Sequence, residues 1–182
     1  MTPEIIRIFG QHVNTDVAYF SFSVWDDIPS KELQKLLQLT HIRHLNVSSC
    51  DLEDKHLEMI GKMETLELLD LDATEITNYG LFFLKPLINL KQLRLKDNPQ
   101  LTNGCVEYLS GIPSLELLHA GNTSITVSGF KALLDRVQLK TLILDSEFAD
   151  SLEELRAISA VHPALEIIVK GKASISNGKL NN

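Results

Sequence analysis

One short pattern of apolar residues returns seven times along the chain at a nearly constant interval. Each copy opens on an apolar residue, and further apolar residues follow after three positions and, in the first six copies, after five. The starts are Val17, Ile42, Leu66, Leu90, Leu115, Leu139 and Leu165. Successive starts thus lie roughly 25 residues apart, and the last interval is the longest. A register held over six steps indicates a repeat architecture, in which each unit buries its apolar face by stacking on its neighbours.

Each unit divides into a strand-forming half and a helix-forming half. Alternating apolar residues, such as Leu69 and Leu71, predict a short strand with one buried face. Three of the second halves share one motif, and Thr77, Thr102 and Thr126 stand where helix N-caps are expected. The predicted helices cover residues 30–39, 53–63, 78–86, 103–109, 128–137 and 151–161. Their apolar residues recur at a spacing of three and are expected to face the strands.

The pattern resembles the leucine-rich repeat family, whose consensus L-x-x-L-x-L-x-x-N/C-x-L has this period. The second-half motif looks like the ribonuclease-inhibitor-like, F-box-associated (cysteine-containing) subclass, here without an F-box. The resemblance covers about residues 17–170 and implies an α/β fold. That fold is a right-handed solenoid in a short horseshoe arc, with parallel strands on the concave face and helices on the convex face. We expect an N-terminal cap (1–16), a repeat domain of six units plus a truncated seventh (17–173), and a polar flexible tail (174–182).

Eight residues after each start, the chain turns away from the strand and leaves backbone amides and carbonyls to be satisfied. A small polar side chain at this position can bond them. The four middle units have Cys50, Thr74, Asn98 and Thr123 there. The outer units depart from the pattern, with Trp25 and Glu147. We therefore interpret Cys50 as a turn residue rather than a nucleophile.

The composition of the chain narrows the classes of function. A net charge of −7 argues against a nucleic-acid binder and against unaided attraction to an anionic membrane. The sequence contains no apolar run long enough to span a bilayer and no secretory signal at its start. The two cysteines, Cys50 and Cys105, are too few for a disulfide framework. A soluble protein in the reducing cytoplasm is expected.

Strand geometry yields a map of the concave face. Residues two, four and six positions after each start point away from the core. The first column is Tyr19, His44, Leu68, Gln92, Leu117, Thr141 and Ile167; the second is Ser21, Asn46, Asp70, Arg94, His119, Ile143 and Val169; the third is Ser23, Ser48, Asp72, Lys96, Gly121 and Asp145. The map predicts that Asp70 pairs with Arg94 and Asp72 with Lys96. It also predicts an exposed aliphatic group: Leu68, Leu117, Ile143, Ile167 and Val169.

A clustered set of exposed apolar residues suggests an interaction surface. We therefore predict non-catalytic binding of a protein or peptide partner on the concave face by a monomeric scaffold, without cofactor or metal. Tyr19, Arg94 and the aliphatic group are the expected anchors. In the competing interpretation, loops or the tail cover the aliphatic residues and the ion pairs merely satisfy one another.

The enzyme hypothesis finds no supporting residues. His44 and His119 lie three units apart, roughly 14 Å by strand spacing, which is too far for a shared metal. A reactive Cys105 at a helix start lacks a neighbouring histidine to act as its base. Two other functions stay open. The chain could be an assembly or adaptor subunit that uses its helices or ends, as in a related mitochondrial ATP-synthase coupling factor. It could also be a secreted bacterial effector or surface protein that binds a host protein.

Overall fold

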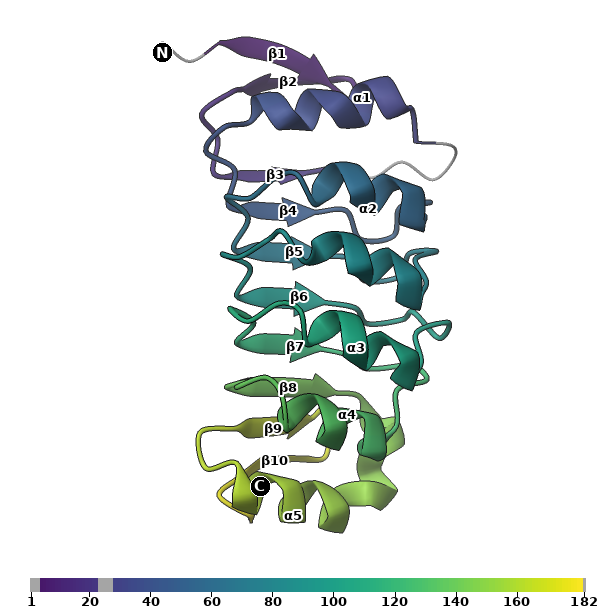
Figure 1. Ribbon diagram of the computed structural model, residues 1–182, viewed down its shortest axis with the longest axis vertical. Helices are drawn as coiled ribbons and strands as arrows, with labels where there is room; N and C mark the ends of the chain where they lie inside the picture. The colour runs from purple at the N-terminus through teal and green to yellow at the C-terminus, as the bar shows by residue number, and fades with distance from the viewer. Residues whose placement is uncertain (1–3, 23–27, 182) are drawn as a thin grey trace.

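The computed structural model describes residues 4–22 and 28–181, and these residues build a nine-stranded sheet. Seven of its strands are parallel and pair in the order in which they occur in the chain. They are β3 (Tyr19–Ser21), β4 (His44–Asn46), β5 (Leu68–Asp70), β6 (Gln92–Arg94), β7 (Leu117–His119), β8 (Thr141–Leu144) and β9 (Glu166–Val169). Each strand lies beside the strand of the next unit (Figure 1), so equivalent residues line up across the sheet.

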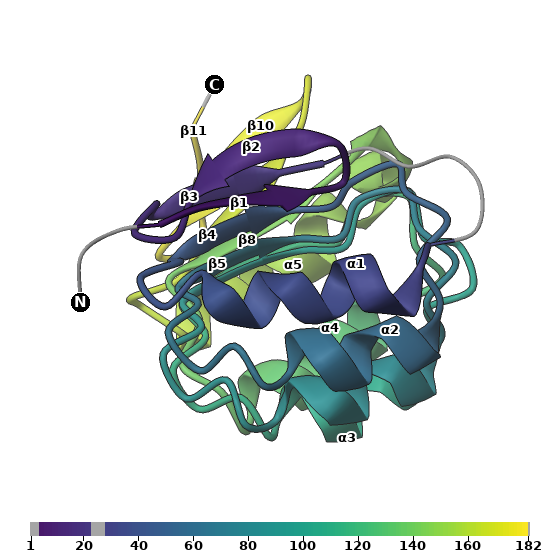
Figure 2. The same cartoon turned by 90° about the horizontal axis from the view of Figure 1, so that it is seen from above.

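The second halves of the units lie on one side of the sheet and leave its other side open (Figure 2). The helical segments, with η marking a 3-10 helix, are α1 (Ser30–Lys35), η1 (Leu36–Gln38), α2 (Asp54–Ile60), η2 (Asn78–Leu84), η3 (Asn103–Cys105), α3 (Val106–Leu109), α4 (Val127–Leu134), η4 (Ser146–Ser151) and α5 (Leu152–Val161). The segment predicted as a helix over 78–86 is thus a 3-10 helix. Its buried Leu81 and Leu84 are three residues apart, which suits a helix with three residues per turn.

The core lies between the sheet and the helical layer. Strand leucines such as Leu69, Leu71 and Leu93 are completely buried, and so are Leu81 and Leu84 from the layer above them. Strand and helix thus bury their apolar residues against each other, as the alternating and three-residue patterns predicted.

The polar turn residues bond the backbone as predicted. The Asn98 side chain donates to the carbonyls of Leu71 and Leu95 and accepts from the Thr74 amide. The Cys50 thiol donates to the Phe22 carbonyl, 3.3 Å away. Thr123 donates to a carbonyl of its own turn. In the sixth unit the Glu147 carboxylate accepts from the Asn122 amide instead. Trp25 and Ser23 lie outside the described residues.

All three predicted threonines stand at N-cap positions, of η2, η3 and α4. The Thr77 and Thr102 hydroxyls accept hydrogen bonds from the amides of Tyr79 and Gly104. The Thr126 hydroxyl accepts no such bond from α4 and is bonded to the Ser128 hydroxyl at 2.8 Å.

The predicted register of the last unit is wrong. Strand β9 pairs with β8 so that Ile167 aligns with Leu142 and Val169 with Leu144. Ile167 and Val169 are therefore buried in the core rather than exposed on the concave face. The apolar Leu165 places the start of this unit one residue too late: Glu166 pairs with Thr141, and these two residues are 25 apart, as the paired Tyr19 and His44 are. A shift of one residue turns every side chain to the opposite face.

Hairpins lie at both ends of the stack. At the start, β1 (Ile5–Ile8) and β2 (Gln11–Asn14) pair and bury Ile8 and Val13. At the other end, β10 (Ala173–Ser176) pairs antiparallel with both β9 and β11 (Lys179–Asn181). The expectation of a flexible tail is thus wrong, because Ile175 is fully buried and anchors this hairpin. The proposed domain boundaries stay predictions.

Candidate functional site

The open face is the side of the parallel sheet opposite the helical layer, and it corresponds to the predicted concave face. The strand register aligns its residues in three rows, which we number by their distance from the strand start. The first row is Tyr19, His44, Leu68, Gln92, Leu117, Thr141 and Glu166; the second is Ser21, Asn46, Asp70, Arg94, His119, Ile143 and Ile168. Backbone bonds between the following turns align a third row: Ser48, Asp72, Lys96, Gly121, Asp145 and Lys170.

Arg94 lies at the centre of this face and bridges two carboxylates. Its Nε is 3.3 Å from Asp70 Oδ2, and its Nη2 is 3.5 Å from Asp72 Oδ2. The predicted pair of Asp70 and Arg94 is confirmed. The predicted side-chain pair of Asp72 and Lys96 is wrong: Asp72 accepts from the backbone amide of Lys96 at 2.7 Å. The Lys96 ammonium instead lies 3.0 Å from Asp97 and 3.7 Å from Asp145.

His119 is packed beneath the charged groups, with only 1% of its surface exposed. The Lys170 ammonium lies 2.9 Å from its Nε2. Because an ammonium can only donate, Nε2 accepts, and the ring proton is on Nδ1, 3.7 Å from Asp72 Oδ2. Burial, together with the neighbouring Lys170 and Arg94 charges, lowers the pKa of His119 to about 4. His119 is therefore neutral at physiological pH.

Asp72 is shifted in the opposite direction. Its burial and the neighbouring Asp70 carboxylate raise the pKa of Asp72 to about 6, and the amide of Lys96 and the guanidinium of Arg94 offset only part of that rise. The open face therefore holds a compact charged cluster, which we define as Asp70, Asp72, Arg94, His119, Asp145 and Lys170. Its members compensate one another and present little net charge to a partner.

Three residues of the open face escaped the sequence map. Glu166, Ile168 and Lys170 occupy the positions assigned to the last unit once β9 is in its true register. The signal that could have found them is the last interval, which is one residue longer than any other. Moving the start of the last unit back by that one residue places all three on the face.

Exposure varies along the open face. Its exposed residues include Tyr19, His44, Gln92, Glu166 and Lys170. Leu68, Leu117, Thr141, Ile143 and Ile168 are half-buried, as are Lys96 and Asp145. The aliphatic group of the prediction thus reduces to Leu68, Leu117 and Ile143 and gains Ile168.

The described residues contain no cluster of three or more His, Cys, Asp and Glu side chains that could hold a metal. The second cysteine is also poorly placed for chemistry. Cys105 is completely buried, and burial raises the pKa of its thiol to about 12. A thiol with this pKa is protonated at neutral pH and is a weak nucleophile.

A second kind of ladder runs along the loops that lead into the helical layer. Asp54, Asn78 and Asn103 each accept a hydrogen bond from the backbone amide of a threonine in the next unit. Those threonines are Thr77, Thr102 and Thr126, and their hydroxyls bond the same side chains. The sequence pattern predicts these threonines only as helix caps. We call this set of bonds the loop ladder.

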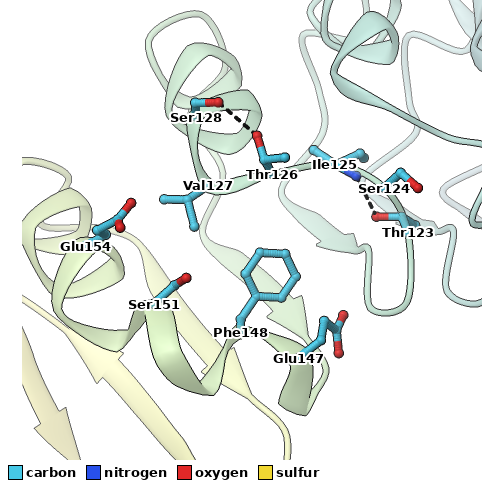
Figure 3. Close-up of a pocket in the computed structure, with 10 residues that line it drawn as sticks. All are labelled: Thr123, Ser124, Ile125, Thr126, Val127, Ser128, Glu147, Phe148, Ser151 and Glu154. Atoms are coloured by element: carbon cyan, nitrogen blue, oxygen red, sulfur yellow. Dashed lines mark hydrogen bonds between the residues drawn. The ribbon is translucent and has the colours of Figure 1, made fainter.

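The loop ladder stops at α4, where the spacing places Val127 in the position of Asn103. A cavity of about 440 Å³ opens there, between the loop of residues 123–127 and the start of α5 (Figure 3). Its walls carry the hydroxyls of Thr126, Ser128 and Ser151 and the carboxylates of Glu147 and Glu154. Valine cannot supply the side-chain oxygen that accepts from the next unit elsewhere in the ladder, so this bond is missing here.

No protein-family model and no curated protein matches the chain. Solved structures do match, and one of them is the crystal structure of internalin C2 from Listeria monocytogenes str. 4b F2365. It is 17% identical, with a TM-score of 0.52, and the alignment covers 87% of this chain and 74% of that one. A likeness at this identity shows the fold alone, so the leucine-rich repeat fold is confirmed. The ribonuclease-inhibitor-like subclass stays a prediction.

Across residues 4–22 and 28–181, none of the helices has the length and apolar character that crossing a bilayer requires.

Proposed function

We propose that the chain is a non-catalytic protein-binding module that holds a protein or peptide partner on its open face. The observation that carries the proposal is a sheet face without a helical cover, on which half-buried aliphatic residues surround a compensated charged cluster. Parallel sheets are usually covered on both faces. A face of this kind is available to a partner. The similarity in fold to internalin C2 supports an interaction module of the leucine-rich repeat type.

The charged cluster favours specific docking over general attraction. The side chain of Arg94 is 43% exposed although it already contacts Asp70 and Asp72, so its free guanidinium edge can bond a partner while its position is fixed. An arginine held in place loses less conformational freedom on binding, and arginines are common among residues that dominate interface energies.

The apolar part of the contact lies beside the cluster. Leu117 neighbours Thr141, and Ile143 neighbours Ile168, across the C-terminal strands. These side chains are half-buried, and a partner that covers them would remove more apolar surface from water, worth about 25 cal/mol per Å². Tyr19 extends the surface at the opposite end. The proposal also includes a monomeric state and a cytoplasmic location, both of which rest on the sequence.

The test begins with co-purification of the tagged chain and identification of its partner by mass spectrometry. The affinity of that partner is then measured for Tyr19→Ala combined with Leu117→Asp. We expect the complex to weaken by at least about tenfold. Tyr79→Ala on the helical layer is the matched control for Tyr19→Ala, because the two tyrosines are 55% and 57% exposed. Loss of affinity with the control alone would move the contact to the helical layer and refute the open face.

An assembly or adaptor role is the second candidate function, and one observation favours it. The helical layer carries exposed aromatic residues, Tyr79 and Phe82, that the core does not require. A partner bound there would leave the open face free.

A further inference from the structure

An aromatic patch lies on the outer surface of the helical layer, away from the open face. It consists of Tyr79, Phe82 and Phe83 from η2 and Tyr108 from α3. Phe82 is central: its ring centroid lies 5.9 Å from that of Tyr79, 5.6 Å from Phe83 and 6.2 Å from Tyr108. The three-residue spacing in this segment predicted only the core-facing leucines. Tyr79, Phe82 and Phe83 lie in the same helical turns, outside that spacing, and could have indicated the patch.

Folding alone does not account for the patch. Leu81 and Leu84 already fill the core beneath η2, and both are fully buried. Tyr79 and Phe82 are about half-exposed and contact mainly other aromatic residues of the patch. Clustered exposed aromatic residues mark interaction surfaces more often than isolated ones do.

Phe82 separates two hollows. One, of about 320 Å³, is lined by Tyr79, Tyr108, Glu107 and Gly111, and the other, of about 510 Å³, by Phe83, Pro86, Gly61, Glu58 and Lys62. Phe82 and Lys85 line both hollows. The ring of Tyr108 stands at 83° to that of Phe82 and at 89° to that of Tyr79. The ring of Tyr108 is thus nearly perpendicular to the almost parallel rings of Tyr79 and Phe82, so the patch is not one flat aromatic floor.

The polar groups at the rim are hydrogen-bond donors that still lack an acceptor. Among the described parts of the chain, the hydroxyls of Tyr79 and Tyr108 have no hydrogen-bond partner, and the Lys85 ammonium has no carboxylate partner. Glu107 likewise has no ion pair within residues 4–22 and 28–181. The second hollow is bordered by Glu58, whose carboxylate lies 3.7 Å from Lys62. The patch thus offers apolar walls, free donors and an unpaired carboxylate.

We propose that the aromatic patch binds an extended, proline-rich segment of a protein partner that carries a basic residue beside its prolines. A polyproline II helix has no internal hydrogen bonds, so its carbonyls can accept from the Tyr79 and Tyr108 hydroxyls and from Lys85. Its three residues per turn place apolar rings on one side at intervals of roughly 9 Å, which suits two hollows on either side of one ring. Aromatic-lined grooves are a recurrent means of binding such segments.

The charge of the first hollow is the reason for expecting a basic residue in the bound segment. Glu107 at the first hollow is the unpaired carboxylate, and a partner arginine or lysine beside it would form the missing ion pair. A bound amphipathic helix is less favoured, because its apolar side chains form one stripe that needs a continuous groove, whereas here two separate hollows share Phe82. The proposal is independent of the open face.

The test measures binding of a fluorescein-labelled peptide of about ten residues, composed of prolines followed by two arginines, by fluorescence anisotropy. We expect a saturable isotherm that weakens at least about tenfold for Phe82→Ala and for Tyr108→Ala. Glu107→Gln should weaken the arginine-containing peptide and leave a peptide of prolines alone unchanged. Tyr19→Ala, on the open face, should bind as the unaltered chain does. Circular dichroism and urea unfolding establish that each variant is folded.

Three outcomes would overturn the proposal. One is the absence of saturable binding. The second is equal affinity for a glycine–serine peptide with the same two arginines, which would show attraction by charge alone. The third is a dimer seen by sedimentation that Phe82→Ala abolishes, which would assign the patch to a second copy of this chain. None of these results would affect the open face, whose own test depends on the loss of affinity in Tyr19→Ala combined with Leu117→Asp.

Discussion

The middle of the stack and its C-terminal end follow the same repeat but are held together differently. In the middle, each turn contains a residue with a left-handed backbone: Ser49, Ala73, Asp97 and Asn122, with φ between 51° and 58°. The loop ladder joins the same units. At the C-terminal end, the equivalent turn enters the 3-10 helix η4, Val127 occupies the ladder position, and β9 pairs with the antiparallel strand β10.

The difference teaches that the leucines alone do not determine the regularity of the stack. Both regions bury apolar side chains on the inward face of their strands. Only the middle also has a short polar side chain at each turn that bonds backbone groups of its own unit or of the one before it. Where Glu147 and Val127 replace such residues, the chain adopts another local structure while the core stays continuous. Repeat stability is then a sum over neighbouring contacts that need not be equal.

The largest effect is expected for Asn98→Ala in the middle of the stack. Asn98 is completely buried and bonds Leu71, Leu95 and Thr74, so alanine leaves several buried backbone groups unsatisfied. The free energy of unfolding should fall by about 3–4 kcal/mol. Thr123→Ala, in the last of the middle units, removes a bond to the Ala120 carbonyl and a long bond from the Ile125 amide, and should cost about 1 kcal/mol. Urea unfolding compares them, and equal losses would show that the bonds of Asn98 to the preceding unit do not strengthen the middle of the stack.

At the C-terminal end, the expected weak point is packing rather than a polar turn. Ile175→Ala removes a fully buried side chain of β10 and should lower the free energy of unfolding by about 3 kcal/mol. Leu180→Ala in the neighbouring strand β11 is the control, because its side chain is 39% exposed and its loss should cost under about 1 kcal/mol. A negligible effect of Ile175→Ala in urea unfolding would restore the expectation of a flexible tail.

The sequence predicted the regular middle of the stack better than its C-terminal end. Apolar periodicity located the strands β3 to β8 and the inward face of each, because burial is imposed on every unit alike. It failed at β9, because Leu165 is a plausible apolar start and Ile167, Ile168 and Val169 are all apolar, so that their pattern fits two registers one residue apart. The prediction that Lys96 pairs with Asp72, its neighbour in the same row, also failed. A long flexible side chain reaches several carboxylates at similar distances, and the neighbouring charges decide which of them it contacts.

A pH effect of intermediate size is expected in the charged cluster of the open face, at Asp72 and His119. Between about pH 4 and 6.5 the unfolded chain binds more protons at His119, whose pKa falls from 6.5 to about 4 on folding, so this residue makes stability rise with pH. Asp72 does the opposite between its ordinary 3.8 and its folded pKa of about 6, because the folded chain then binds more protons. The two contributions largely cancel.

Single substitutions should separate them. In Asp72→Asn, which retains an oxygen to accept from the Lys96 amide, the free energy of unfolding should rise by about 2 kcal/mol more than in the unaltered chain between about pH 4.5 and 6.5. In His119→Gln the same interval should show a fall relative to the unaltered chain. Urea unfolding at both pH values measures the slopes. Parallel profiles for all three proteins would show that neither pKa is shifted.

The smallest effect concerns the loop ladder itself. Asn103→Val copies the break at Val127 into the preceding unit and removes the acceptor for the Thr126 amide, now 2.9 Å away. These bonds are exposed to water, so the free energy of unfolding should fall by only about 1 kcal/mol. The more direct readout is hydrogen exchange, in which the Thr126 amide should lose protection while the Thr102 amide, bonded to Asn78, keeps it.

The matched control for this change is Asn103→Asp. It introduces the carboxylate that Asp54 uses at the equivalent position, so it retains the acceptor and should preserve protection at Thr126. If Thr126 stays protected in Asn103→Val as well, the ladder does not hold the loops. The cavity beside Val127 would then need a cause other than the missing side-chain acceptor.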